Sequence, residues 1–180
     1  MAIQQADLLY KYTGAGAHDA VQANPDASLG NFRASSLITS GVDNNLFDDV
    51  SGAEAAAGDT EYRAIAFHNN HGSLALTACK IWISVDTGNG EDDIKFDIES
   101  PSNEVNGFIQ TIANESAAPI GLPGWSDATT KGTGKDCPLG GNEVGLGEWF
   151  GIWLQRIISA AASAAAAEAV TMRVEGDTAA

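Results

Sequence analysis

Positive charge is scarce in this sequence. Its 180 residues include 9 Lys and Arg against 24 Asp and Glu, which gives a formal net charge of −15 at pH 7. A surface this acidic repels the phosphate backbone of nucleic acids and the headgroups of anionic lipids. We therefore expect neither a nucleic acid nor a membrane as a partner.

Long apolar runs and cysteines are scarce as well. No stretch approaches the about 20 apolar residues that a membrane helix needs, and the N-terminus lacks the basic and apolar regions of a secretory signal. The two cysteines, Cys79 and Cys137, lie far apart and form no CxxC pair. In a chain made in the cytoplasm, this spacing favours free thiols over a disulfide.

Motifs that would carry chemistry are incomplete. His68 and His71 lie across a strand end and a turn, without a third metal ligand beside them. The acidic loop 86–93 lacks the spacing of a calcium loop, residues 132–135 lack the spacing of a phosphate loop, and residues 124–128 lack the last glycine of a nucleophile elbow. We therefore predict no catalytic residue, no metal and no cofactor, and expect that the protein is not an enzyme.

What the sequence does contain is alternation of apolar and polar residues over short segments, which is typical of β-strands. In residues 62–68 it places Ile65 and Phe67 on one side of a half-buried strand, and it leaves Trp82 as a large exposed aromatic on the next. Residues 149–158 are apolar on both faces at their start, which favours a central strand. The expected strands cover residues 62–68, 74–85, 94–99, 107–112, 149–158 and 170–175.

Turn residues between these segments predict antiparallel hairpins. Residues 69–72 (NNHG) are expected to connect a hairpin of the first two strands. The alanine-rich residues 160–169 have helical propensity, but their length and their position between two strands favour a hairpin loop. Gly176 is expected to end the last strand. The sequence thus predicts an all-β protein, an antiparallel β-sandwich or a jelly-roll-like fold.

The composition changes along the chain and suggests two parts. Residues 1–35 are polar and rich in small residues, and we expect them to form an extended N-terminal arm. Residues 36–180 are expected to form a single β-sandwich domain, with long loops at 100–147, where four of the five prolines lie.

Aromatic side chains are the candidates for contacts with other molecules, because an exposed aromatic is costly unless a partner covers it. A carbohydrate-binding module that stacks sugar rings on tryptophans is one alternative. For a protein interface, we expect contributions from Tyr10, Tyr12, Phe32, Phe47, Trp82 and Trp125.

Several strings resemble the structural proteins of tailed-bacteriophage virions. They are NPDASLG at 24–30, NLFDDVSGAEA at 45–55, GDTEYR at 58–63, LALTACKIWI at 74–83, and the segments 149–158 and 174–178. The resemblance covers about residues 24–178. It implies a virion protein, made in the host cytoplasm, whose partners are the major capsid protein or tail proteins.

The acidic surface narrows the expected place in the virion, because it is unsuited to lie against packaged DNA. A capsid decoration or cement protein is the favoured hypothesis, with the domain arranged as a symmetric homo-oligomer and the arm reaching onto neighbouring subunits. A tail or head-to-tail protein and an adhesin module remain open as alternatives.

Overall fold

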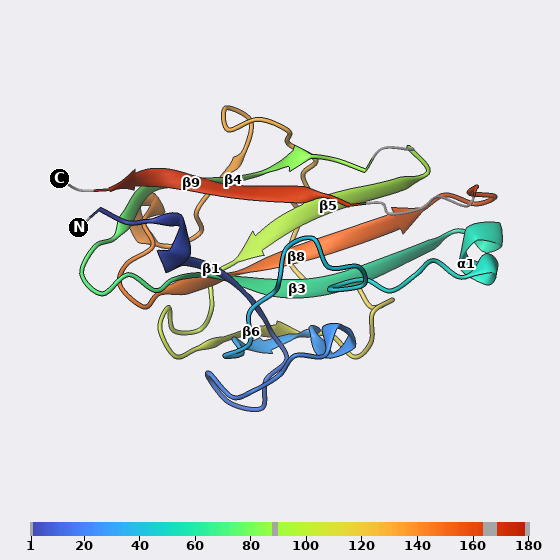
Figure 1. Cartoon of the computed structure of the whole chain (residues 1–180). Helices are drawn as coiled ribbons and strands as arrows, with labels where there is room; N and C mark the ends of the chain where they lie inside the picture. The colour runs from blue at the N-terminus through green and yellow to red at the C-terminus, as the bar shows by residue number, and fades with distance from the viewer. Residues whose placement is uncertain (1, 88–89, 164–168, 179–180) are drawn as a thin grey trace.

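The chain folds into antiparallel sheets with almost no helix. The computed structural model describes residues 2–87, 90–163 and 169–178 (Figure 1). Its strands are β1 (Leu8–Tyr12), β2 (Gly30–Phe32), β3 (Asp59–Asn69), β4 (Leu76–Val85), β5 (Asp92–Glu99), β6 (Phe108–Thr111), β7 (Lys135–Asp136), β8 (Trp149–Ile158) and β9 (Thr171–Thr178). One short α-helix, α1 (Gly52–Ala57), and three single 3₁₀ turns, Gln5–Asp7, Pro25–Ala27 and Gly140–Asn142, complete the order. The all-β prediction is confirmed.

A four-stranded sheet in the order β1-β3-β8-β5 lies at the centre of the molecule. The central strand β8 pairs with β3 from Trp149 to Ile158 and with β5 from Gly151 to Ile158. Its central position, predicted from its apolar start, is confirmed. Alternation along β3 is confirmed too, but the strand is not half-buried: residues 61–69 are all buried, because other chain segments cover both faces of the sheet.

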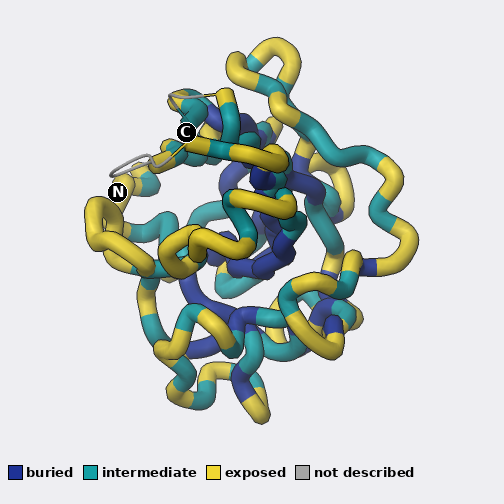
Figure 2. The backbone as a smooth tube through the Cα atoms, turned by 90° about the vertical axis from the view of Figure 1, so that its right-hand side faces the viewer, coloured by how far each residue is buried: buried dark blue, intermediate teal, exposed yellow. Residues whose placement is uncertain are grey.

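On one face of the central sheet lies the three-stranded sheet β7-β4-β9, and on the other lies the ribbon β2-β6 (Figure 1). The larger core fills the space next to the three-stranded sheet and takes Phe67, Ile81, Phe96 and Phe150 from the strands on its two sides. A smaller core of Ala, Ile, Tyr and Trp side chains covers the opposite face. Figure 2 shows the buried residues in the middle and the exposed ones on the surrounding loops.

The predicted hairpins are wrong. Strands β3 and β4 belong to different sheets, and so do β8 and β9, because β9 pairs with β4. Alternation sets the faces of a strand but does not choose its neighbour. Part of the alanine-rich segment, residues 164–168, lies outside the described residues. Strand β9 also continues past Gly176, where its end was expected, to Thr178.

The structure also differs from the expected division of the chain into an arm at 1–35 and a domain with long loops at 100–147. Residues 1–35 do not form a separate arm: β1 is the edge strand beside β3, Thr13 Oγ1 donates a hydrogen bond of 2.7 Å to the Ala64 carbonyl, and Arg33 and Ala34 are buried. The composition is polar, but the backbone of β1 pairs along five residues. Within the expected loops 100–147, β6, β7 and a 3₁₀ turn are the elements formed.

The cysteines meet although the sequence separates them widely. Both are free and buried, and the Cys137 N–H donates a 2.9 Å hydrogen bond to the Cys79 carbonyl. The hydrogen bond with the neighbouring Cys137 thiol, together with burial, raises the pKa of Cys79, so the thiol form dominates there.

Removing residues 1–35 tests whether the N-terminal segment belongs to the fold. We expect the truncated protein to lose its cooperative thermal unfolding transition, because β3 would lose the pairing partner on one edge and the Arg33 contacts of its buried end. Circular dichroism during heating measures this. Removal of residues 1–2 alone is the control and is expected to leave the transition intact. An unchanged transition after the long deletion would restore the idea of an independent arm.

Candidate functional site

A groove lies beside the larger core. It encloses about 1880 Å³ and runs between β9, β1, the central sheet and the loop 37–52. Small-molecule pockets usually measure roughly 300–1,000 Å³, so this groove has room for a larger occupant. Apolar side chains of the core line its wall, among them Leu8, Tyr10, Phe67, Met172 and Val174.

The local sequence explains how the groove is built. In β9, Met172 and Val174 alternate with Arg173 and Glu175, so the apolar side chains point toward the core and the charged ones point away. Met172 and Val174 are half-buried, whereas Ile81 and Ile83 opposite them on β4 are fully buried. The apolar face of β9 is therefore incompletely covered.

The loop 37–52 brings both apolar and acidic side chains to the groove. Leu37, Val42 and Val50 line it, and they are among the exposed large hydrophobic residues of the described chain. Asp43 and Asp49 lie in the same loop and are exposed. The mouth of the groove thus combines exposed apolar surface with negative charge.

Buried charges stand at the end of the groove near α1. Arg156 on β8 donates a 2.6 Å hydrogen bond from Nε to Glu61 on β3 and a 2.7 Å hydrogen bond to the Asp48 carbonyl. Its guanidinium lies 4.8 Å from the centre of the Phe47 ring, a cation–π contact. Burial raises the pKa of Glu61, and the charge of Arg156 opposes that effect. These contacts anchor the loop to the sheet.

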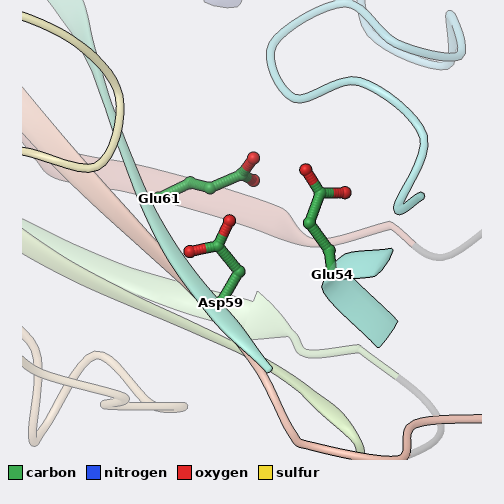
Figure 3. Close-up of side chains that lie close together, drawn as sticks. All are labelled: Glu54, Asp59 and Glu61. Carbon is green, nitrogen blue, oxygen red and sulfur yellow. The ribbon is translucent and has the colours of Figure 1, made fainter. Parts of the chain in front are cut away.

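Three acidic side chains meet beside this ion pair. Glu54, Asp59 and Glu61 have carboxylate oxygens within 4.8 Å of one another (Figure 3). Each already accepts a hydrogen bond: Glu54 from the Ser51 N–H at 2.6 Å, Asp59 from the Thr60 N–H at 2.7 Å, and Glu61 from Arg156. Hydrogen bonds from Ser51 also lower the pKa of Glu54. Local donors and Arg156 therefore account for the cluster.

The structure places the six proposed interface residues in the interior or at its margin. Tyr12 and Trp82 are buried, and the other four are half-buried. Trp82 was expected to be exposed, but it is buried, and Gly134 of the loop before β7 packs next to its Cβ atom. Ring contacts join Tyr10 to Phe67, Phe32 to Phe108, and Trp125 to Tyr62. The Tyr12 hydroxyl donates a hydrogen bond to the Asn45 carbonyl, and the Phe47 ring lies against the guanidinium groups of Arg63 and Arg156. Only Tyr10 and Phe47 line the groove.

The two histidines of the weak metal motif have separate partners. His71 Nδ1 accepts hydrogen bonds from the Ser73 and Leu74 N–H groups at 3.1 and 3.0 Å. His68 is buried, and its Nδ1 accepts from the Arg33 guanidinium at 3.0 Å. Among the described residues, neither belongs to a cluster of three metal-ligating side chains.

A buried basic network surrounds His68. Arg33 also donates to His18 Nε2 at 2.8 Å and to Asp19 at 3.1 Å, and Lys11 lies 3.5 Å from Asp19. Burial lowers the pKa of His68 to about 3, and the positive charges of Arg33 and Lys11 add to this effect. Burial also lowers the pKa of His18, against the opposing charge of Asp19. Both histidines act as neutral acceptors that hold residues 18–33 to β3.

Sequence reasoning missed the groove and the basic network. Their parts come from segments far apart in the chain, and pairing of β9 with β4 rather than β8 creates the groove. The one signal in the sequence was the presence of apolar residues, such as Leu37, Val42 and Val50, in the segment 37–50, whose composition is otherwise typical of a loop.

Comparison of the chain with protein-family models, with curated proteins and with solved structures finds no match. Within the described residues, no helix is long and apolar enough to cross a membrane. Function has to be argued from the groove and from the residues themselves.

The ion pair under the loop can be tested by substitution. We expect Arg156→Met to lower the free energy of unfolding by about 3–5 kcal/mol, because Glu61 would remain buried without its partner. The double variant Arg156→Met/Glu61→Met is expected to regain much of that loss. Urea denaturation measures both, and a double variant as unstable as the single one would contradict this account.

Because of His68, we expect the free energy of unfolding to decrease in acid. Its pKa is lower in the folded than in the unfolded chain, so the unfolded state gains a proton below about pH 6.5 that the folded state refuses until about pH 3. The resulting stability is complete above pH 6.5 and falls with pH by about 1.4 kcal/mol per pH unit.

In His68→Gln, this contribution is absent while an acceptor for Arg33 remains possible. Between pH 6.5 and 5, wild type should therefore lose about 2 kcal/mol more than the variant in urea denaturation. Parallel pH profiles of the two proteins would show that His68 titrates normally.

Proposed function

We propose that the chain is a structural protein of a tailed-bacteriophage virion that works by binding other virion proteins. The observation that carries this proposal is the groove, which is wide, has an apolar wall, and opens between exposed apolar and acidic side chains. Exposed apolar surface with a polar rim is typical of protein interaction sites. The resemblance of residues 24–178 to virion structural proteins supports the same proposal.

Charge supports a position on the outside of the head. A net charge of −15 disfavours contact with packaged DNA, so the proposed role is capsid decoration or cement, with the major capsid protein as partner. Within this proposal the protein is a homo-oligomer, since the symmetry of a shell repeats each contact. Buried area between subunits would then raise the temperature at which the shell fails.

A tail or head-to-tail position is the second form of the proposal, because the same groove could hold a tail protein. A sugar-binding module is less favoured. Three of the four tryptophans, Trp82, Trp149 and Trp153, are buried, and Trp125 is half-buried against Tyr62. Stacking on a sugar ring needs an accessible aromatic face.

Quantitative mass spectrometry of purified virions tests the proposal. We expect the chain to be present in enough copies to cover the capsid, and virions that lack it should lose their DNA at a lower temperature. A copy number sufficient only for a single ring would favour the tail or neck. Absence of the chain from the virion would overturn the proposal.

A further inference from the structure

Strand β9 has an edge that no described strand covers. It is the last strand of the order β7-β4-β9. Both edges of the central sheet are blocked by loop bridges, β1 by Leu37 and β5 by Ser126, and among the residues that the structure describes no such bridge is formed on β9. An open edge presents unpaired N–H and C=O groups to another chain.

The direction of the β9 backbone follows from two contacts with β4. The Asp177 and Thr171 carbonyls accept hydrogen bonds of 3.1 and 3.0 Å from the Thr77 and Ser84 hydroxyls, so these carbonyls face β4. Strand β9 itself is regular, because the extra residue at each register shift of the pair lies on β4. Alternation then directs the backbone groups of Met172, Val174 and Gly176 to the open edge.

Met172 and Val174 direct their side chains into the groove, as their contacts with the larger core show. A strand paired with this edge would therefore place every second side chain over the apolar wall. The eight residues of β9 span about 26 Å at roughly 3.3 Å per residue.

Charge identifies the chemistry of the occupant. The groove is lined by Asp43, Asp48, Asp49 and Glu91 and by Arg156, which is itself paired with Glu61 and Asp48. The surplus is negative, so a cationic segment is attracted. A second copy of this chain brings a net charge of −15 to the contact, which opposes self-association here.

We propose that β9 and the groove bind an extended, basic segment of another virion protein by strand addition, with alternate apolar side chains in the groove. The identity of the partner rests on the proposed function, whereas the binding mode rests on the open edge and the apolar wall. Main-chain hydrogen bonds supply affinity in this mode, and the alternate side chains supply specificity.

A peptide tests the binding mode directly. The probe is a dye-labelled eight-residue peptide of alternating valine and lysine, matched in length to β9, and fluorescence anisotropy measures its binding to the full chain. A peptide of alternating valine and glutamate is the comparison. We expect the lysine peptide to bind at least about tenfold more tightly and to weaken as salt increases. Equal binding of the two peptides, or no binding, would overturn the proposal.

Variants locate the site. Met172→Lys/Val174→Lys places charges in the groove, and we expect it to weaken peptide binding at least about tenfold. Val85→Lys is the matched control, because Val85 belongs to the same sheet, is 58% exposed and does not line the groove. Unaltered binding by the groove variant would overturn the proposal.

A second pair of variants keeps the test independent of folding. Asp43→Asn/Asp49→Asn removes exposed charges at the mouth and is expected to reduce both affinity and salt dependence. Asp26→Asn/Asp127→Asn removes as many exposed charges outside the groove and is expected to bind like wild type. Equal behaviour of the two would overturn the choice of a basic partner.

Virions lacking the chain separate this inference from the proposed function. If wild-type protein rebinds such virions and the groove variant does not, both proposals are supported. If both proteins rebind equally, the function stands and the groove proposal is overturned. If wild-type protein does not rebind, the proposed function is overturned, and the peptide measurements decide the groove proposal.

Discussion

The pairing of β3 with β8 is the constraint on which the structure depends. Ten residues of each strand pair in an unbroken antiparallel register, and both strands are buried over most of their length. A sheet buried on both faces needs cover on both sides. The three-stranded sheet supplies that cover on one face, and the β2-β6 ribbon with its loops supplies it on the other (Figure 1).

Within the three-stranded sheet, β4 and β9 are covered unequally, and this difference produces the groove. Strand β4 is held on both edges, by β7 and β9, and its inward side chains are fully buried. Strand β9 has one neighbour among the described strands, and its inward side chains remain half-buried. Apolar area left in water costs roughly 25 cal/mol per Å², so a partner that completes this side gains free energy.

Buried charge links the surrounding loops to the paired strands. Arg63 on β3 and Arg156 on β8 both contact groups outside the sheet, Glu61 on β3 pairs with Arg156, and His68 binds Arg33 at the other end. Burying a charge is unfavourable without a partner, so each pair requires its loop to stay in place. The acidic mouth of the groove is therefore set by contacts that begin in the core.

The sequence predicted the local features of the fold and missed its long-range ones. The limits of β8, its central position, the faces of β3 and the extent of β5 follow from apolar alternation, because those signals lie within one strand. The partner of β9 and the pairing of β1 depend on contacts across more than fifty residues. Trp82 was misplaced for the same reason: Gly134, which packs next to it, is distant in the chain.

Charge and edge exposure together explain why an open strand can persist on this protein. An unpaired edge normally invites pairing with another copy, and proteins oppose this with charge. Here every copy carries the same excess of carboxylates around the groove, and Arg173 and Glu175 occupy the outer face of β9. Repulsion at the groove would leave this edge available to the proposed basic partner rather than to a second copy.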